Sequence, residues 1–292
     1  MTIAEMREHA DRALKYFFQT MPDVPFEEDD IIIDFAPPSR MFARYKVLCQ
    51  KYRPRYIIPK EHEEQLANSI SGQAIIGEGK SAILICTKQP LLKASLPYII
   101  FHELIHIYCA KIEIDGEHFF DLYGNETPYE ADEILHDGYY IWSEFIADYY
   151  ASKYTRSGQF AFESVRNRII KCLEKDITTP KDNRRDFVWA CLDLITMYEA
   201  ETILNRLTEP DIIISGESTT AQNLRSVFND CVQLLYRQIQ KEKPYKITED
   251  FIVELGDSYN SFETVNTLYR CEQMGGIENA MQIFASKIKT KN

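Results

Sequence analysis

The amino-acid sequence predicts an α+β protein whose first half joins a small mixed sheet to helices and whose second half is all-helical. The chain has 292 residues, 45% of them hydrophobic and 12% aromatic, which is enough to fill a substantial core. Short β-prone runs occur only between residues 31 and 87, and helical periodicity dominates from about residue 160. These observations predict an α+β domain over residues 1–156 and a helical domain over residues 157–292.

The first half opens with a helix and continues with short strands. Residues 3–19 place apolar side chains on one helical face, and the following MPDVPFEEDD has the prolines and charges of a loop. Residues 31–35 and 55–59 are rich in isoleucine and predict two strands. Residues 74–87 contain two β-prone runs around a Gly-Glu-Gly turn and predict two more strands.

Long helical patterns occupy the second half. The predicted helices cover residues 159–175, 184–207, 219–241 and 260–288. Glycine, proline and serine gather in the linkers at 155–159, 178–183, 209–218 and 241–246. The third helix carries an apolar face made of Leu224, Val227, Phe228, Cys231, Leu235 and Ile239. This pattern predicts packing and gives no indication of function.

Composition and charge exclude several classes of protein. The net charge of −12 argues against a nucleic-acid-binding surface, which needs clustered lysine and arginine. The N-terminus lacks the apolar core of a secretory signal, and no run of about 18 apolar residues predicts a membrane span. Seven scattered cysteines without a CxxC pair favour reduced thiols in the cytoplasm. We therefore expect a cytoplasmic protein that binds neither nucleic acid nor membrane.

The segment from His102 to His106 reads His-Glu-Leu-Ile-His, and its context predicts a helix with Ser95 as N-cap. Positions four apart share one face of a helix, so both imidazoles can bind the same metal ion. Glu103 follows the first ligand directly and can act as a general base at the ion's open position. The segment therefore predicts a catalytic metal site rather than a core helix with two hydrogen-bonded histidines.

A catalytic zinc ion needs a third protein ligand, which must come from another part of the chain. The residues after His106 lack the glycine and third histidine of the metzincin pattern. Farther along, residues 142–151 form an amphipathic helical run with Glu144 and Asp148 on one face. Three residues compete with Glu144 as the third ligand, and they are His118, His136 and Asp137.

The HExxH segment and the later Glu-x-x-x-Asp helix resemble those of the gluzincins, the thermolysin-like zinc peptidases. This resemblance implies that His102, His106 and Glu144 bind one zinc ion per chain and that Asp148 accepts a hydrogen bond from a ligating histidine. It also implies that residues 81–87 form the edge strand beside the cleft. The resemblance covers residues 74–155, and the 37 residues between His106 and Glu144 exceed the spacer usual in thermolysin.

The constellation predicts hydrolysis of a peptide bond in a peptide or protein substrate. Zinc would lower the pKa of a bound water, and Glu103 would take its proton and pass it to the leaving amine. No histidine follows His136, so a tyrosine is the expected donor to the oxyanion. The sequence does not choose among the four tyrosines near the site, which are Tyr139, Tyr140, Tyr149 and Tyr154.

Two other functions fit the same residues. One is a catalytically inactive zinc-binding protein that docks a partner, although such a protein would not need the base Glu103. The other is a zinc amidohydrolase that acts on a non-peptide amide. The segment from residue 112 to 137 is rich in carboxylates. They either belong to a solvent-exposed acidic loop or serve to bind basic peptides or a cation. These carboxylates are Asp115, Glu117, Asp121, Glu126, Glu130, Asp132 and Glu133.

Overall fold

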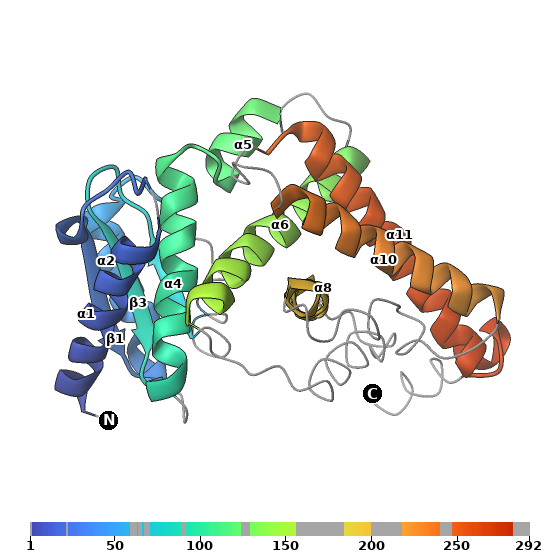
Figure 1. The fold of residues 1–292 in the computed structure, drawn as a ribbon, viewed down its shortest axis with the longest axis horizontal. Helices are drawn as coiled ribbons and strands as arrows, with labels where there is room; N and C mark the ends of the chain where they lie inside the picture. Colours follow the sequence, from blue (N-terminus) through green and yellow to red (C-terminus); the bar gives the residue numbers. More distant parts are fainter. Residues whose placement is uncertain are drawn as a thin grey trace. The chain divides into compact units, whose positions relative to one another are not determined.

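The computed structural model describes residues 2–21, 23–58, 63, 66, 71–88, 92–123, 129–155, 184–199, 218–239 and 247–282. The chain divides into two compact units. Unit 1 contains residues 1–121 and 146–159, and unit 2 contains residues 122–145 and 160–292. Helix α6 (Tyr129–Thr155) continues without a break from unit 2 into unit 1 (Figure 1). The predicted domains were two consecutive segments, 1–156 and 157–292. In the structure, each unit is made of two separate segments of the chain.

Unit 1 is built on a three-stranded mixed sheet in the order β1-β3-β2. Strand β1 (Ile31–Ala36) pairs in parallel with β3 (Ser81–Cys86), and β2 (Gly72–Ile75) pairs antiparallel to β3 on its other side. All six residues of β3 are buried, which is why this strand is an apolar run without polar alternation. The α+β class predicted from the sequence is confirmed.

Helices cover both faces of this sheet. Helix α2 (Pro38–Tyr52) packs on the face that carries Ala82 and Leu84 of β3. Side chains alternate along a strand, so Ile83 and Ile85 lie on the opposite face, where α4 (Leu92–Lys111) contacts β2 and β3. Helix α1 (Ile3–Thr20) packs on α4, and the rings of Phe17 and Phe101 lie 5.3 Å apart. Unit 1 also contains a 3-10 turn (Glu28–Asp30) and most of α5 (Gly116–Tyr123).

Most elements predicted for the first half are present. The opening helix, the strand near residue 31 and the two strands predicted within residues 74–87 are confirmed, although β2 begins slightly earlier, at Gly72. The predicted strand at 55–59 is wrong, because residues 55–58 form no strand and residue 59 lies outside the described residues. Tyr56 donates its backbone N–H to Arg53 O and packs against the core below α2, so it is half-buried without joining the sheet. The prediction of 81–87 as an edge strand is also wrong, because β3 is central and β2 is an edge.

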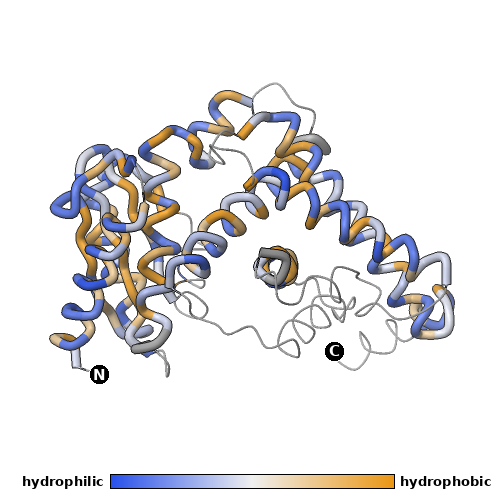
Figure 2. The backbone as a smooth tube through the Cα atoms, in the orientation of Figure 1, coloured by the Kyte–Doolittle hydropathy of each residue, from blue (hydrophilic) through white to orange (hydrophobic). Residues whose placement is uncertain are grey.

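The described part of unit 2 is all-helical, as predicted. It contains α8 (Arg184–Glu199), α10 (Thr219–Ile239) and α11 (Glu249–Gln273) together with the first part of α6. Hydrophobic and hydrophilic segments alternate along α10 and α11 in Figure 2, as expected for amphipathic helices. The helix predicted over 260–288 begins earlier and is interrupted, because Gly275 and Gly276 take positive φ angles of 88° and 106°.

Several predictions for the second half cannot be compared with the structure. The helix predicted at 159–175 lies outside the described residues, as do the linkers apart from their end residues Thr155 and Ser218. Helices α8 and α10 match the starts predicted at residues 184 and 219.

The core of unit 2 is an aromatic cluster. The ring of Phe187 on α8 lies 4.8 Å from Phe262 and 5.0 Å from Tyr259, both on α11, and Phe228 on α10 lies 5.7 Å from Phe262. Nearby, α6 and α11 approach so closely that a Cβ atom on Gly138 would lie 2.1 Å from Ile252 O. Aromatic packing and a close helix crossing therefore shape this unit.

The six described cysteines are buried and form no disulfide, as the sequence predicted. They are Cys49, Cys86, Cys109, Cys191, Cys231 and Cys271. None of the described helices is long and apolar enough to cross a membrane.

Candidate metal centre

Helix α4 brings the two histidines of the HExxH segment together. His102 and His106 lie one turn apart, and their Nε2 atoms are 3.1 Å from each other. His102 is buried and His106 is half-buried, so both rings lie at the inner side of the helix. Two nitrogen ligands of one tetrahedral zinc ion, each about 2.0–2.1 Å from it, lie about 3.3 Å apart. The two histidines already approach this separation.

Asp148 on α6 holds the ring of His102 from its other nitrogen. Its Oδ1 lies 2.8 Å from His102 Nδ1, and the carboxylate is fully buried. A carboxylate accepts hydrogen bonds only, so Nδ1 carries the proton and Nε2 keeps its lone pair. The Nε2 lone pair faces His106, which is the arrangement that a metal-ligating histidine needs.

Tyr98 is a member of the site that the sequence interpretation missed. Its hydroxyl donates to the same Oδ1 of Asp148 at 2.5 Å, and its ring stacks at 6.4 Å from that of His102. Tyr98 precedes His102 by four residues and therefore lies on the same face of α4. That spacing is the signal in the sequence that identifies Tyr98, whereas the four tyrosines expected near the site all follow His106.

Glu144 completes a group of three possible metal ligands. It lies one turn before Asp148 on α6, and one of its carboxylate oxygens falls within 4.8 Å of ligand atoms of His102 and His106. Among the described residues, this is the group of three or more His, Cys, Asp or Glu side chains close enough to hold a metal ion. Two imidazoles and a carboxylate form the donor set of many catalytic zinc sites, so the residues fit the metal that the sequence predicts.

Glu144 also forms an ion pair with Arg185 of α8. The contact joins Arg185 Nη1 to Glu144 Oε2, and the two side chains are 31% and 21% exposed. A carboxylate has two oxygens and about four lone-pair positions, so one guanidinium contact leaves room for a second partner. The described structure therefore places a positive charge directly beside the predicted third ligand.

The Glu103 side chain extends from α4 to the edge strand β2. It is only 6% exposed, and its Oε2 accepts the backbone N–H of Ala74 at 2.7 Å. Strand β2 pairs with β3 on one side only, and the Ala74 N–H points away from β3 toward Glu103. A Cβ atom on Gly72 would lie 3.1 Å from Glu103 Oε1 and 2.5 Å from Ile99, so the absence of a side chain at Gly72 makes room for the carboxylate.

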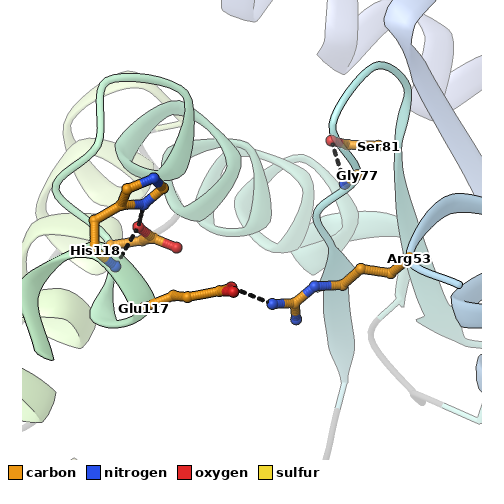
Figure 3. A network of polar contacts seen from close by, with 6 residues as sticks. Arg53, Gly77, Ser81, Glu117 and His118 are labelled. Carbon is orange, nitrogen blue, oxygen red and sulfur yellow. Dashed lines mark hydrogen bonds and ion pairs between the residues drawn. The ribbon is translucent and has the colours of Figure 1, made fainter. Parts of the chain in front are cut away.

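The three competing ligands are engaged elsewhere or exposed. His136 is exposed, and Asp137 accepts a hydrogen bond from Arg184 at 2.9 Å. His118 on α5 bonds through Nδ1 to Asp115, and this hydrogen bond is the main cause of its raised pKa. Figure 3 shows that contact beside the 2.5 Å ion pair between Glu117 and Arg53. Two carboxylates of the acidic segment, Asp115 and Glu117, therefore have partners in His118 and Arg53.

The four tyrosines considered from the sequence have packing partners. Tyr154 stacks on Tyr150 at 6.0 Å and also contacts Phe101 at the same centroid distance. The hydroxyl of Tyr149 accepts a hydrogen bond from Lys153 at 3.2 Å. The ring of Tyr140 lies under the guanidinium of Arg184 at 4.3 Å. Tyr139 is half-buried on α6, and the choice of an oxyanion donor among these residues stays a prediction.

Comparisons with protein-family models, with curated proteins and with solved structures gave no match. The assignment of the site therefore rests on its own geometry.

Proposed function

We propose that this protein is a zinc-dependent peptidase in which His102, His106 and Glu144 hold the ion and Glu103 is the general base. The observation that carries the proposal is the convergence of the two Nε2 atoms, 3.1 Å apart, with Asp148 bonded to the far nitrogen of His102. A buried carboxylate that fixes the proton on Nδ1 and leaves the lone pair on Nε2 is the partner that a metal-ligating histidine needs. Glu144 supplies the negatively charged third donor.

Zinc bound there would polarise the scissile carbonyl and acidify a water molecule. Glu103 then acts through Oε1, because Oε2 accepts the Ala74 N–H. Oε1 takes a proton from the attacking water and later delivers it to the leaving amine. Asp148 keeps the proton on His102 Nδ1 throughout, so that Nε2 stays a ligand.

The choice of a peptide as substrate rests on Glu103 and on its neighbour β2. Glu103 is the only acidic residue in the HExxH segment, and its burial beside the histidines suits a base rather than a surface charge. Strand β2 ends the sheet, and an extended peptide can add to such an edge with its backbone near the base. The same features support hydrolysis over a partner-binding role with a purely structural metal.

The test compares zinc-loaded wild type with Glu103→Gln on unfolded proteins and on a panel of non-peptide amides. The proposal predicts cleavage of peptide bonds by wild type and a loss on the order of 10²–10⁴-fold in Glu103→Gln, with the zinc retained. Equal cleavage by both proteins would contradict the role of Glu103. Hydrolysis restricted to non-peptide amides would instead support an amidohydrolase, and a loaded protein inactive on every amide would support the inactive binding protein.

A further inference from the structure

Two arginines of α8 bind two carboxylates of α6. Arg184 Nη1 donates to Asp137 Oδ1 at 2.9 Å, and Arg185 Nη1 contacts Glu144 Oε2. Asp137 and Glu144 are seven residues apart, which places them on the same face of α6 two turns from each other. All four residues belong to unit 2. The two ion pairs are therefore similar in kind, but only one of them involves a candidate metal ligand.

Each guanidinium is also supported by an aromatic ring. Arg184 lies over Tyr140 at 4.3 Å, and Arg185 lies over Trp189 at 5.1 Å, one turn later on its own helix. A guanidinium on an aromatic face gains cation–π attraction and loses little freedom when it forms its planar hydrogen bonds. Arg185 is thus a fixed group and not a solvated chain that meets Glu144 by chance.

We infer that Arg185 is a positioning residue of the metal centre, which holds Glu144 through Oε2 so that its other oxygen is presented to the ion. This inference rests on the proposed metal site. Carboxylates that bind metals are usually hydrogen-bonded in their turn, and the loss of such a partner typically costs about 10–100-fold in metal affinity.

The electrostatics of α6 favour this role. Glu144 and Asp148 are four residues apart on one helix face, where two like charges repel each other. The Arg185 charge offsets this repulsion beside the histidines. The opposite effect, repulsion between the guanidinium and the metal, is weakened by solvent because both members of the ion pair are more than one fifth exposed. Loss of Arg185 should therefore weaken metal binding and not strengthen it.

Competition with a chelator on the full-length protein measures this effect without any substrate. Arg185→Ala should lower zinc affinity by about 10–100-fold, and Arg185→Lys, which keeps the charge but loses the planar donor pair, should recover part of the loss. Arg184→Ala is the matched control, because it removes the neighbouring ion pair and should leave the affinity within about twofold. Circular dichroism and melting temperature establish that each variant is folded.

A double-mutant cycle separates this role from a general loss of structure. In the Glu144→Gln variant, the remaining zinc affinity of the two histidines can be measured by competition with a weaker chelator. In this background Arg185→Ala should have no further effect on zinc affinity. Unchanged or tighter zinc binding in Arg185→Ala, or an equal loss in both backgrounds, would overturn the role of Arg185 and leave the proposed function standing. A wild-type protein that binds no zinc would overturn both.

Discussion

Helices α4 and α11 are both long, but they bury different kinds of side chain. Helix α4 buries His102 and Glu103, and each of these polar groups meets a partner brought by another element, Asp148 or Ala74. Helix α11 buries Phe251, Leu255 and Phe262, and crosses α6 where Gly256 lies against Ile134 O.

The difference separates what holds the protein together from what the protein does. Apolar burial on α11 stabilises the fold directly, whereas burying a charge on α4 costs free energy unless its partners are in place. Unit 2 does bury Asp193, Gln238 and Asn266. Within the described residues, however, only the group on α4 and α6 has the composition and proximity of a metal site. We therefore expect substitutions on α11 to change stability and those around α4 to change metal binding.

The largest effect should come from Phe262→Ala. Phe262 is fully buried and contacts both Phe187 and Phe228, so its removal leaves a cavity and should lower the free energy of unfolding by about 3–5 kcal/mol. Urea unfolding measures this change, and zinc content should be unaltered while the variant is folded. A loss of zinc from a folded Phe262→Ala protein would show that the two regions are not separable in this way.

Gly138→Ala should come next in size. The added Cβ would lie 2.1 Å from Ile252 O and 2.9 Å from Gly256 N, so α6 and α11 must move apart. Overpacking of this kind lowers the free energy of unfolding by about 1–3 kcal/mol. We expect a value near ~3 kcal/mol, because the atoms that the new Cβ meets are backbone atoms, which cannot move aside as a side chain can. Gly79→Ala is the control, because its Cβ meets nothing within 4 Å and φ is not left-handed. Equal unfolding midpoints for the two variants would contradict the close crossing.

A smaller effect, on affinity instead of stability, is expected from Asp148→Asn. The amide keeps the shape of the carboxylate but loses the charge that holds the proton on His102 Nδ1. Zinc affinity should fall at least about tenfold, close to 1.4 kcal/mol, in a chelator competition. Tyr98→Phe removes only the hydroxyl bonded to the same oxygen and should cost less. A tighter-binding Asp148→Asn protein would refute this role for Asp148.

The smallest effect concerns two buried cysteines, one in each unit, whose thiols should behave alike. Burial raises the pKa of the Cys109 thiol on α4 and of the Cys231 thiol on α10 to about 12, because desolvation disfavours the thiolate. Both thiols should resist alkylation at about pH 8 in the folded protein and react after unfolding. An unfolded thiol ionises near pH 8.5, so this contribution to stability is lost as the pH rises from there toward 12. Peptide mass spectrometry of the alkylated protein distinguishes the two cysteines.

The sequence predicted the parts of this structure that depend on local spacing. One turn of helix separates His102 from His106 and Glu144 from Asp148, so each pair could be placed on a face before any fold was known. The buried strand β3 was visible as an apolar run, but such a run does not say whether a strand is central or at an edge. The edge position of residues 81–87 was an implication of the resemblance to the gluzincins, and the sheet order contradicts it.

The contacts between distant segments could not be read from the sequence. Nothing near Gly72 indicates that its missing side chain makes room for Glu103, and nothing in the Arg-Arg pair at 184 and 185 indicates which carboxylates it meets. Tyr56 and Ile58 have the composition of a strand, yet they pack on the core beside a turn after α2. Tertiary packing decided these cases against local propensity.

The central claim is that His102, His106 and Glu144 hold one metal ion, and metal content tests it most directly. Elemental analysis of protein purified after supply of zinc should give about one zinc per chain for wild type and Glu103→Gln, and almost none for His102→Ala and Glu144→Ala. Unaltered zinc in Glu144→Ala would contradict the assignment of the third ligand. Absence of any metal from the folded wild type would contradict the account as a whole.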